Sequence, residues 1–225
     1  MTNSTSPVIT LDGPSGAGKG TIAHAVACEL GFHILDSGSL YRLTALASLQ
    51  DKIDASDEVA ISETARTLDV KFKPHDCGLD IILRGEDVTE AIRTEEIGMR
   101  ASKVAAIPAV RDALLQRQRD FSEAPGLVAD GRDMGTTVFP DAPVKVFMTA
   151  SAEERAERRY KQLKEKGINA NIAALVEDLK QRDEQDANRA VSPLKPAEDA
   201  VLLDTTSMSI QEVTQKVLDL AALRL

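Results

Sequence analysis

Short apolar segments alternate along the chain with longer segments of helical period. Strands are predicted at residues 7–11, 33–36, 127–129, 144–148 and 200–204, which are short and rich in aliphatic side chains. Helices are predicted at residues 19–30, at 41–49, after residue 151, at 172–188 and at 210–223. Strands that alternate with helices through short connections are typical of a parallel sheet with crossover helices. We therefore predict an α/β fold built on a doubly wound, five-stranded parallel sheet.

Local signals support two of these helices. In the first, Ile22, Val26 and Leu30 recur at i, i+4 and i+8 and share one face, and Gly31 is a residue type that ends helices. In the helix after residue 151, Ser151 is predicted as the N-cap. Glu154, three residues further on, is predicted to complete a capping box.

Residues 57–93 interrupt the alternation of strand and helix. Segments 68–73 and 79–83 have the composition of two strands joined by a turn at 74–78, so we predict a hairpin-like insert. A long helix is predicted at residues 94–121. Pro108 is expected to break or kink it, because proline has no backbone N–H and its ring clashes with the preceding turn.

The composition narrows the classes of protein that the chain can belong to. Its formal net charge of −9 argues against a general nucleic-acid or membrane-surface binder, since both need broad basic faces. The N-terminus has no basic region followed by a long apolar run, and no segment approaches the roughly 20 apolar residues of a membrane span. We expect a cytoplasmic protein whose two cysteines, Cys28 and Cys77, are reduced thiols, with a disulfide as the alternative.

A glycine-rich segment, Gly13 to Lys19, lies between the first predicted strand and the first predicted helix. Its spacing and position are those of a phosphate-binding loop (P-loop), in which glycines let backbone N–H groups turn toward an anion and the helix N-terminus adds partial positive charge. Lys19 is expected to reach the β- and γ-phosphates of a nucleoside triphosphate. A plain glycine-rich turn is the alternative, and the flanking strand and helix disfavour it.

The position after Lys19 departs from the usual P-loop pattern. Ser or Thr normally follows the lysine and binds Mg²⁺, whereas this chain has Gly20 and then Thr21. No hydroxyl can bind the metal at residue 20. We therefore expect no direct metal ligand from the protein there: Mg²⁺ would be carried by ATP and would lie near Thr21 through a water molecule.

Arginine and carboxylate side chains follow several of the predicted strands. Residues beyond the carboxyl ends of the strands face the ligand crevice of a doubly wound sheet. The groups are Ser37 with Arg42; Asp130, Arg132 and Asp133; Arg155, Arg158 and Arg159; and Arg182, Asp186 and Arg189. Any one of them could be a surface ion pair, a turn with solvated charges or a salt-bridged helix face. Together they suit phosphoryl transfer, which depends on positioning and on stabilising phosphate charge, a task for which arginine is well fitted.

The chain resembles the bacterial cytidylate kinase family from about Pro7 to the C-terminus, and five segments carry the resemblance. They are GPSGAGKGT, LDSGSLYR, ADGRDMGTTVFPDA, ERAERR and RDEQDANRAVSPL. The resemblance implies a monomeric (d)CMP kinase that transfers phosphate from ATP, with Mg²⁺, to CMP or dCMP. It further implies one P-loop kinase core (residues 7–56, 94–154 and 171–225), a nucleotide-binding insert at 57–93 and a short helical lid at 155–170.

The resemblance also implies a role for each candidate residue. The donor phosphates would be held by Gly13, Pro14, Ser15, Gly16, Ala17, Gly18, Lys19, Gly20 and Thr21, with Arg155 and Arg158 closing over them. The acceptor phosphate would lie among Ser37, Arg42, Arg132 and Arg189. Cytosine would be bound by Ser102, Arg111 and Asp133, and the ribose by Arg182 and Asp186. The catalytic residues would be Lys19, Arg132, Arg158 and Arg189.

Two other functions fit parts of this pattern. A kinase of the same fold could act on another small acceptor, such as UMP, AMP or shikimate. The insert and the Gly131-Arg132-Asp133 loop disfavour that hypothesis, because a small acceptor would not need so many phosphate-binding arginines. A nucleotide-binding switch protein would need no acceptor-phosphate arginines at all.

Overall fold

The chain folds into two compact units. The computed structural model describes residues 6–75, 78–165 and 167–225. One unit combines the residues up to Asp36 with Arg119–Leu225, and the other is Ser37–Gln118. The predicted insert at 57–93 lies inside the second unit, which is larger than that prediction. Within the described ranges, no helix is both long enough and apolar enough to cross a membrane.

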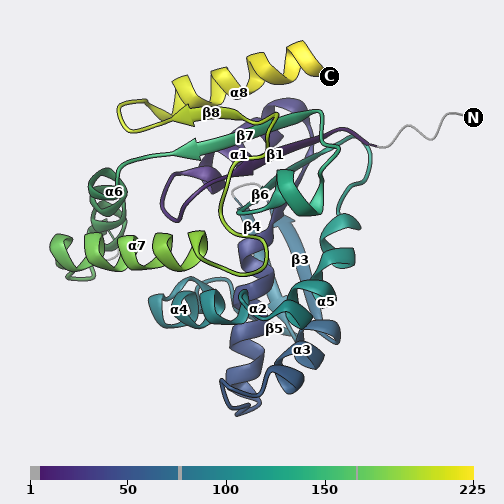
Figure 1. The fold of residues 1–225 in the computed structure, drawn as a ribbon, viewed down its shortest axis with the longest axis vertical. Helices are drawn as coiled ribbons and strands as arrows, with labels where there is room; N and C mark the ends of the chain where they lie inside the picture. The colour runs from purple at the N-terminus through teal and green to yellow at the C-terminus, as the bar shows by residue number, and fades with distance from the viewer. Residues whose placement is uncertain (1–5, 76–77, 166) are drawn as a thin grey trace, which may run out of the picture. The chain divides into compact units, whose positions relative to one another are not determined.

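The first unit is built on a five-stranded parallel sheet (Figure 1). Its strands are β1 (Val8–Asp12), β2 (His33–Asp36), β6 (Leu127–Gly131), β7 (Val144–Thr149) and β8 (Val201–Asp204). The spatial order is β2-β6-β1-β7-β8, so β1 lies at the centre and pairs with both β6 and β7. The predicted doubly wound sheet is therefore confirmed, with all five strands where the apolar segments placed them.

The two faces of β1 have different neighbours, because successive side chains of a strand point to opposite sides. Ile9 and Leu11 are fully buried in a core that α1 (Lys19–Leu30) and α8 (Ile210–Arg224) share with the strands. Thr10 and Asp12 face the other side, toward the π-helical turn η2 (Met134–Val138) that follows β6. The centre of the sheet thus carries an aliphatic core on one face and buried polar groups on the other.

Two long helices, α6 (Ala152–Glu165) and α7 (Ile172–Ala187), pack against each other in the first unit (Figure 1). The capping box predicted for α6 is half right. The N–H of Glu154 bonds the Ser151 hydroxyl at 3.1 Å, but the Glu154 carboxylate pairs with Arg158 instead of returning to Ser151. The backbone N–H of Ser151 donates to Thr206 Oγ1, so a residue from after β8 replaces the expected partner. A complete capping box is present at Ser209, before α8.

The second unit contains four helices and a small antiparallel sheet among its described residues. The helices are α2 (Ser37–Gln50), α3 (Glu58–Arg66), α4 (Glu95–Val104) and α5 (Pro108–Arg119), with a short 3₁₀ turn η1 (Ala91–Arg93) before α4. The sheet order is β3 (Val70–His75), β4 (Gly78–Leu83), β5 (Glu86–Asp87). The predicted hairpin is confirmed, α3 and β5 are additional, and the expected break at Pro108 separates α4 from α5. Cys28 is a free, exposed thiol, whereas Cys77 lies outside the described residues.

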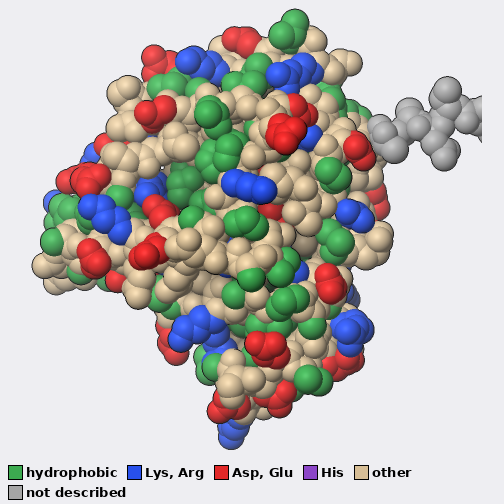
Figure 2. Space-filling view, in the orientation of Figure 1, with side chains coloured by type: hydrophobic (Ala, Val, Ile, Leu, Met, Phe, Trp, Pro, Cys, Tyr) green, Lys and Arg blue, Asp and Glu red, His purple; other side chains and the backbone are tan. Residues whose placement is uncertain are grey.

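Charged side chains of both signs are interspersed on the face that Figure 2 shows. On that face, among the residues that the structure describes, lysine and arginine do not form one continuous patch. This distribution agrees with the net charge of −9.

Candidate active site

The P-loop connects β1 to α1 as the sequence predicted. Gly13 has a φ of +148°, and a Cβ there would lie 2.1 Å from the carbonyl oxygen of Met148, so only glycine fits so close to β7. Gly18 caps α1 in the left-handed conformation, which directs the first N–H groups of the helix toward the loop. The loop therefore has the backbone arrangement of an anion site at a helix N-terminus.

Lys19 is almost fully buried at the start of α1. Its Nζ donates a 2.9 Å hydrogen bond to the carbonyl oxygen of Pro14 and lies 3.8 Å from Oδ1 of Asp130. Burial lowers the pKa of Lys19 to about 8, and the nearby Arg132 acts in the same direction. The lysine is thus folded back into its own loop, with its charge partly offset by Asp130.

Two carboxylates with little solvent exposure lie at the carboxyl ends of the central strands. Asp12 ends β1 and accepts 2.8 Å hydrogen bonds from the backbone N–H groups of Met134 and Gly135. Burial raises the pKa of Asp12 to about 6, although these two hydrogen bonds oppose the shift. Burial likewise raises the pKa of Asp130, at the end of β6, to about 7 against the influence of Lys19. In both groups burial disfavours the charged carboxylate, and such shifted pKa values are common at functional sites.

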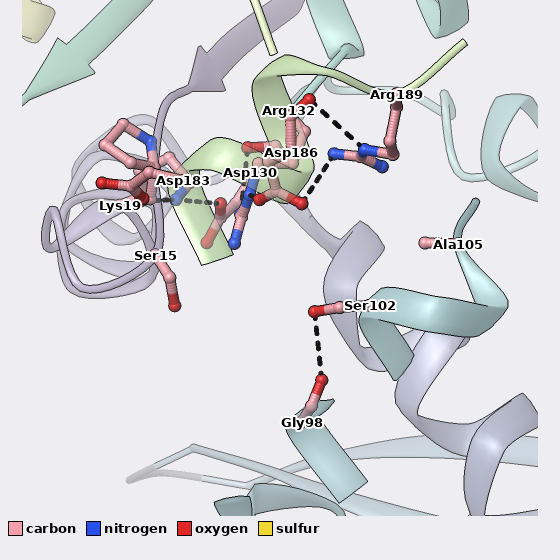
Figure 3. A network of polar contacts seen from close by, with 12 residues as sticks. Ser15, Lys19, Gly98, Ser102, Ala105, Asp130, Arg132, Asp183, Asp186 and Arg189 are labelled. Atoms are coloured by element: carbon pink, nitrogen blue, oxygen red, sulfur yellow. Dashed lines mark hydrogen bonds and ion pairs between the residues drawn. The ribbon is translucent and has the colours of Figure 1, made fainter. Parts of the chain in front are cut away.

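Arg132, Asp186 and Arg189 form one ion-pair cluster (Figure 3). Nε of Arg132 lies 2.8 Å from Oδ2 of Asp186, and Nη2 of Arg189 lies 3.0 Å from Oδ1 of the same carboxylate. Burial alone would raise the pKa of Asp186, but Arg132 and Arg189 outweigh it and hold that pKa below its usual value. Arg182, one turn earlier on α7, is also buried and attracts the same carboxylate. The helix face predicted at 182, 186 and 189 is therefore a buried cluster rather than a solvated surface.

Asp133 immediately precedes the η2 turn and is buried. Its backbone carbonyl accepts a hydrogen bond from the N–H of Thr137, so the residue is fixed at the entrance to the π-helical turn. Such turns are rare and occur frequently at functional sites. The η2 turn, which follows Arg132 and Asp133, is bound through its backbone by Asp12 on the neighbouring strand β1.

The two predicted lid arginines of α6 have different surroundings. Arg155 is 3% exposed, and its Nη1 donates to the carbonyl oxygen of Ser15, within the P-loop, at 2.8 Å. Arg155 also pairs with Asp183 of α7. Arg158 is more exposed and bonds the carbonyl oxygen of Thr205 at 2.7 Å. A Cβ built on Gly18 would lie 3.8 Å from Nη1 of Arg158, so that guanidinium adjoins the N-terminus of α1.

Four predicted residues belong to the second unit. Ser37 donates a 2.6 Å hydrogen bond to Oε1 of the buried Gln118, and Arg42 donates to the carbonyl oxygen of Ile92 at 2.7 Å. Ser102 bonds the carbonyl of Gly98, one helical turn earlier (Figure 3). Arg111 is buried, bonds the carbonyl of Ala105 at 3.2 Å and lies 5.6 Å over the ring of Tyr41. All four polar groups have defined partners inside this unit.

Few side chains that could take part in holding a metal ion border the first turn of α1. In the part of the chain that the structure describes, no three His, Cys, Asp or Glu side chains are grouped to hold a metal ion by themselves. A Cβ on Gly20 would lie 3.4 Å from Oδ2 of Asp130, and Thr21 is exposed on the first turn of α1. One carboxylate and one hydroxyl therefore border the first turn of α1.

The structure brings together, within the first unit, Lys19, Asp130, Arg132, Asp186 and Arg189. Sequence reasoning missed Asp12, Asp183 and Gln118. For Asp12 a signal existed, since an acidic residue at the end of a buried strand just before a P-loop is unusual. No local pattern could identify Asp183 and Gln118. Their partners, Arg155 and Ser37, lie 28 and 81 residues away along the chain.

Comparison with known proteins gives a consistent set of relatives. The profile of the cytidylate kinase family matches residues 9–223. A cytidylate kinase from Stutzerimonas stutzeri (strain A1501) is 61% identical over 214 residues, covering 94% of this chain and 93% of that protein. One from Colwellia psychrerythraea (strain 34H / ATCC BAA-681) is 60% identical over 213 residues, 94% of each chain. Among solved structures, a gluconokinase from Sinorhizobium meliloti 1021 is similar over 98% of this chain and 94% of its own, with a TM-score of 0.47 and 16% identity.

Proposed function

The chain belongs to the cytidylate kinase family, and from that membership we infer that it phosphorylates CMP and dCMP with ATP. The enzyme transfers the γ-phosphoryl group of ATP to an oxygen of the acceptor phosphate. The bond from the γ-phosphorus to the β,γ-bridging oxygen breaks, a bond to the acceptor oxygen forms, and ADP and CDP or dCDP leave. The acceptor phosphate is itself the nucleophile and is largely dianionic near pH 7, so no general base is required.

The observation that supports this assignment most directly is the buried Arg132–Asp186–Arg189 cluster. A nucleotide-binding switch protein has no use for two arginines gathered on one buried carboxylate outside its P-loop. A phosphate acceptor does, because arginine binds phosphate bidentately and remains charged. We assign Arg132 and Arg189, with Ser37 and Arg42 of the second unit, to the acceptor phosphate.

On the donor side we assign the loop from Gly13 to Thr21 to the phosphates of ATP, with Lys19 moving from Pro14 to the β- and γ-phosphates. Arg158 would add positive charge from α6. Charge builds up on the oxygens of the transferring group, so positioned cations at these places would supply most of the stabilisation. Mg²⁺ carried by ATP would neutralise phosphate charge, and Thr21 and Asp130 would hold it through water.

For the nucleoside we assign Asp133, Ser102 and Arg111 to the cytosine base and Arg182 with Asp186 to the ribose. The carboxylate of Asp133 can only accept hydrogen bonds and suits the N4 amino group of cytosine, whereas the guanidinium of Arg111 can only donate and suits N3 and O2. The cytoplasmic location, the monomeric state and the lid at residues 155–170 remain predictions.

The test is a coupled assay of ADP release with each of the ribo- and deoxyribonucleoside monophosphates as acceptor. We expect CMP and dCMP to give the highest kcat/KM. ADP release that does not depend on any nucleoside monophosphate would favour the switch protein. A preference for UMP or AMP would favour a kinase of the same fold with a different acceptor.

A further inference from the structure

Arg155 is engaged by protein acceptors on almost every side. Its Nε donates to the carbonyl oxygen of Ala150 at 3.0 Å, and its two Nη1 donors reach Ser15 O at 2.8 Å and Oδ1 of Asp183 at 3.0 Å. Its Nη2 pairs with Oδ2 of Asp183. A guanidinium has five N–H donors, so four of them are engaged within the protein. Its side chain is only 4% exposed.

Only one N–H of Arg155 is left over, so bidentate binding of the donor phosphates by Arg155 would require its pair with Asp183 to break. Removing one partner of a buried ion pair leaves an uncompensated charge, which is strongly unfavourable. Arg158, one turn further along α6, also bonds Glu154 and Thr205 but is less enclosed. Its side chain is 26% exposed, and its guanidinium adjoins Gly18 at the N-terminus of α1.

The bond from Arg155 to the P-loop fixes the orientation of one peptide unit. In a trans peptide the C=O and N–H groups point in opposite directions. When Ser15 C=O is held toward Arg155, the N–H of Gly16 must therefore point to the other side of the loop. Gly16 has a φ of +78°, and a Cβ there would lie 3.3 Å from Cβ of Arg155, so the arginine stem packs directly over the loop backbone.

We propose that Asp183 is a positioning residue for the donor site: it holds Arg155 against Ser15, so that Arg155 braces the P-loop and does not itself bind the phosphates. This proposal deepens the function proposed above and rests on it for the identity of the donor. It revises the role that the family resemblance suggested for Arg155 and gives a role to a carboxylate that the sequence did not single out.

The position of Asp183 on α7 adds a second consequence. Asp186 lies three residues further on and holds Arg132 and Arg189, so one helix supplies a carboxylate to the P-loop brace and another to the arginine cluster. Residues three apart on a helix share a face. A change at Asp183 is therefore expected to act mainly on ATP, and a change at Asp186 mainly on the acceptor.

The test compares Asp183→Asn, Arg155→Lys and the double variant with Glu153→Gln as the matched control. Glu153 forms an exposed α6–α7 ion pair with Lys180 at 3.1 Å, so its variant makes the same kind of acid-to-amide change between the same two helices. The affinity for a fluorescent ATP analogue is measured without acceptor. The KM for ATP, the KM for CMP and kcat are then measured at saturating concentration of the other substrate.

We expect each single variant to weaken ATP binding about tenfold or more, in line with the loss of one charge-assisted hydrogen bond, and to raise the KM for ATP more than that for CMP. The double variant should be no worse than either single one, because both remove the same brace. Glu153→Gln should behave as wild type.

ATP binding by Asp183→Asn that equals the control, or exceeds it because a released Arg155 reaches the phosphates, would overturn the proposal. If both single variants fail to fold, the Arg155–Asp183 pair is needed for the stability of the chain, and the proposal is overturned as well. Because ATP binding is measured without acceptor, failure of this inference differs from failure of the proposed function, which would appear as no CMP-dependent ADP release by the wild type.

Discussion

The carboxylate of Asp12 accepts a 2.8 Å hydrogen bond from the backbone N–H of Gly135, 123 residues further along the chain. A second bond of the same length comes from Met134, so both oxygens of Asp12 hold the turn that follows Arg132 and Asp133. Gly135 favours this close approach, because a Cβ there would lie 3.0 Å from Thr10 Oγ1 and 3.4 Å from Oδ2 of Asp12, so neighbouring atoms would have to shift. The end of β1 therefore determines the position of the loop assigned to the acceptor.

Asp12→Asn should therefore impair the acceptor side. An asparagine keeps one acceptor oxygen and sets an amide N–H against a backbone N–H, so one charge-assisted bond is lost. That loss corresponds to roughly 1.5–3 kcal/mol, or about 10- to 100-fold in kcat/KM for CMP. The measurement is the KM for CMP and for ATP in the folded variant, and the KM for CMP should rise more.

Thr10→Val is the control for that variant. Thr10 lies on the same face of the same strand, and its buried hydroxyl oxygen has no hydrogen-bond partner among the described residues. Replacing it with an apolar side chain of the same shape should leave stability and kinetics close to those of wild type. Equal KM values for CMP in Asp12→Asn and Thr10→Val would show that the Asp12 bonds do not position the turn.

Lys19→Ala should lower kcat by on the order of 10²-fold or more while the chain remains folded. Lys19 belongs to the loop that is assigned to the donor phosphates, and its loss removes charge stabilisation where charge develops. The measurement is kcat at saturating ATP and CMP together with a thermal melt. Lys216→Ala, an exposed lysine on α8, is the control. Near-normal turnover of Lys19→Ala would remove the catalytic role assigned to this lysine.

The arrangement of the sheet could be predicted from the sequence because the information is local. Each of the five strands is a short apolar segment, and the break at Pro108 follows from the chemistry of a single residue. α3 was missed, although Asp57 caps it by accepting a hydrogen bond from Ala60. Its segment was assigned as a whole to a strand-rich insert.

The polar contacts of the site could be predicted only in part. Arg132, Asp186 and Arg189 were identified as candidates by residue type and helical spacing, but not as one cluster, since their pairing spans 54 residues. Glu154 was predicted to complete a capping box, which proved wrong because Arg158 offers a stronger, charged partner one turn away. Long-range partners such as Gly135 for Asp12 leave no trace in a local pattern.

Asp130 should make stability depend on pH in a direction opposite to that of a salt-bridged carboxylate. Its pKa is raised from 3.8 to about 7 by burial. Between about pH 4 and pH 7 the folded state therefore binds a proton that the unfolded state has lost, and stability falls as pH rises through this window. Asp130→Asn should remove this contribution, so its stability relative to that of wild type should increase as pH rises from about 4 to 7.

The control for Asp130→Asn is Asp51→Asn. The hydrogen bonds from Arg84 hold the pKa of Asp51 below its usual value, so that carboxylate stabilises the folded state above about pH 4 and loses the effect in acid. Urea unfolding of all three proteins from pH 4.5 to 8 should show the stability of Asp130→Asn increasing with pH relative to wild type, and Asp51→Asn less stable than wild type by a nearly constant amount. A constant difference for Asp130→Asn across that range would contradict the shifted pKa.

Asp186→Asn should impair both CMP and dCMP. A residue that bound only the ribose 2′-hydroxyl would matter for CMP and not for dCMP, which lacks that group. Asp186 also holds Arg132 at 2.8 Å and Arg189 at 3.0 Å, so its loss should disturb the acceptor phosphate of either nucleotide. We expect kcat/KM to fall at least about tenfold for both, with Glu184→Gln on α7 unaffected. Unchanged kinetics with dCMP would confine Asp186 to the ribose.

The base preference provides the sharpest test of the site. Asp133 is buried at the entrance to the η2 turn. Cytosine offers an N4 amino donor, whereas uracil offers an O4 acceptor at the same place. A carboxylate is acceptor-only, so UMP would set its O4 against Asp133 and leave buried groups without partners. Sites built on such hydrogen bonds reject the wrong ligand by as much as roughly 10⁴-fold.

Asp133→Ala should therefore lower kcat/KM for CMP by the equivalent of roughly 1–3 kcal/mol, the range for one good contact to a base edge. UMP should lose much less, because the variant also removes the repulsion between O4 and the carboxylate, and the CMP/UMP ratio of kcat/KM should collapse. Asp141→Ala, a variant of an exposed aspartate beyond the same turn, should keep the wild-type ratio. If Asp133→Ala also keeps the wild-type CMP/UMP ratio, Asp133 does not bind the base, and its role is limited to the structure at the start of the η2 turn.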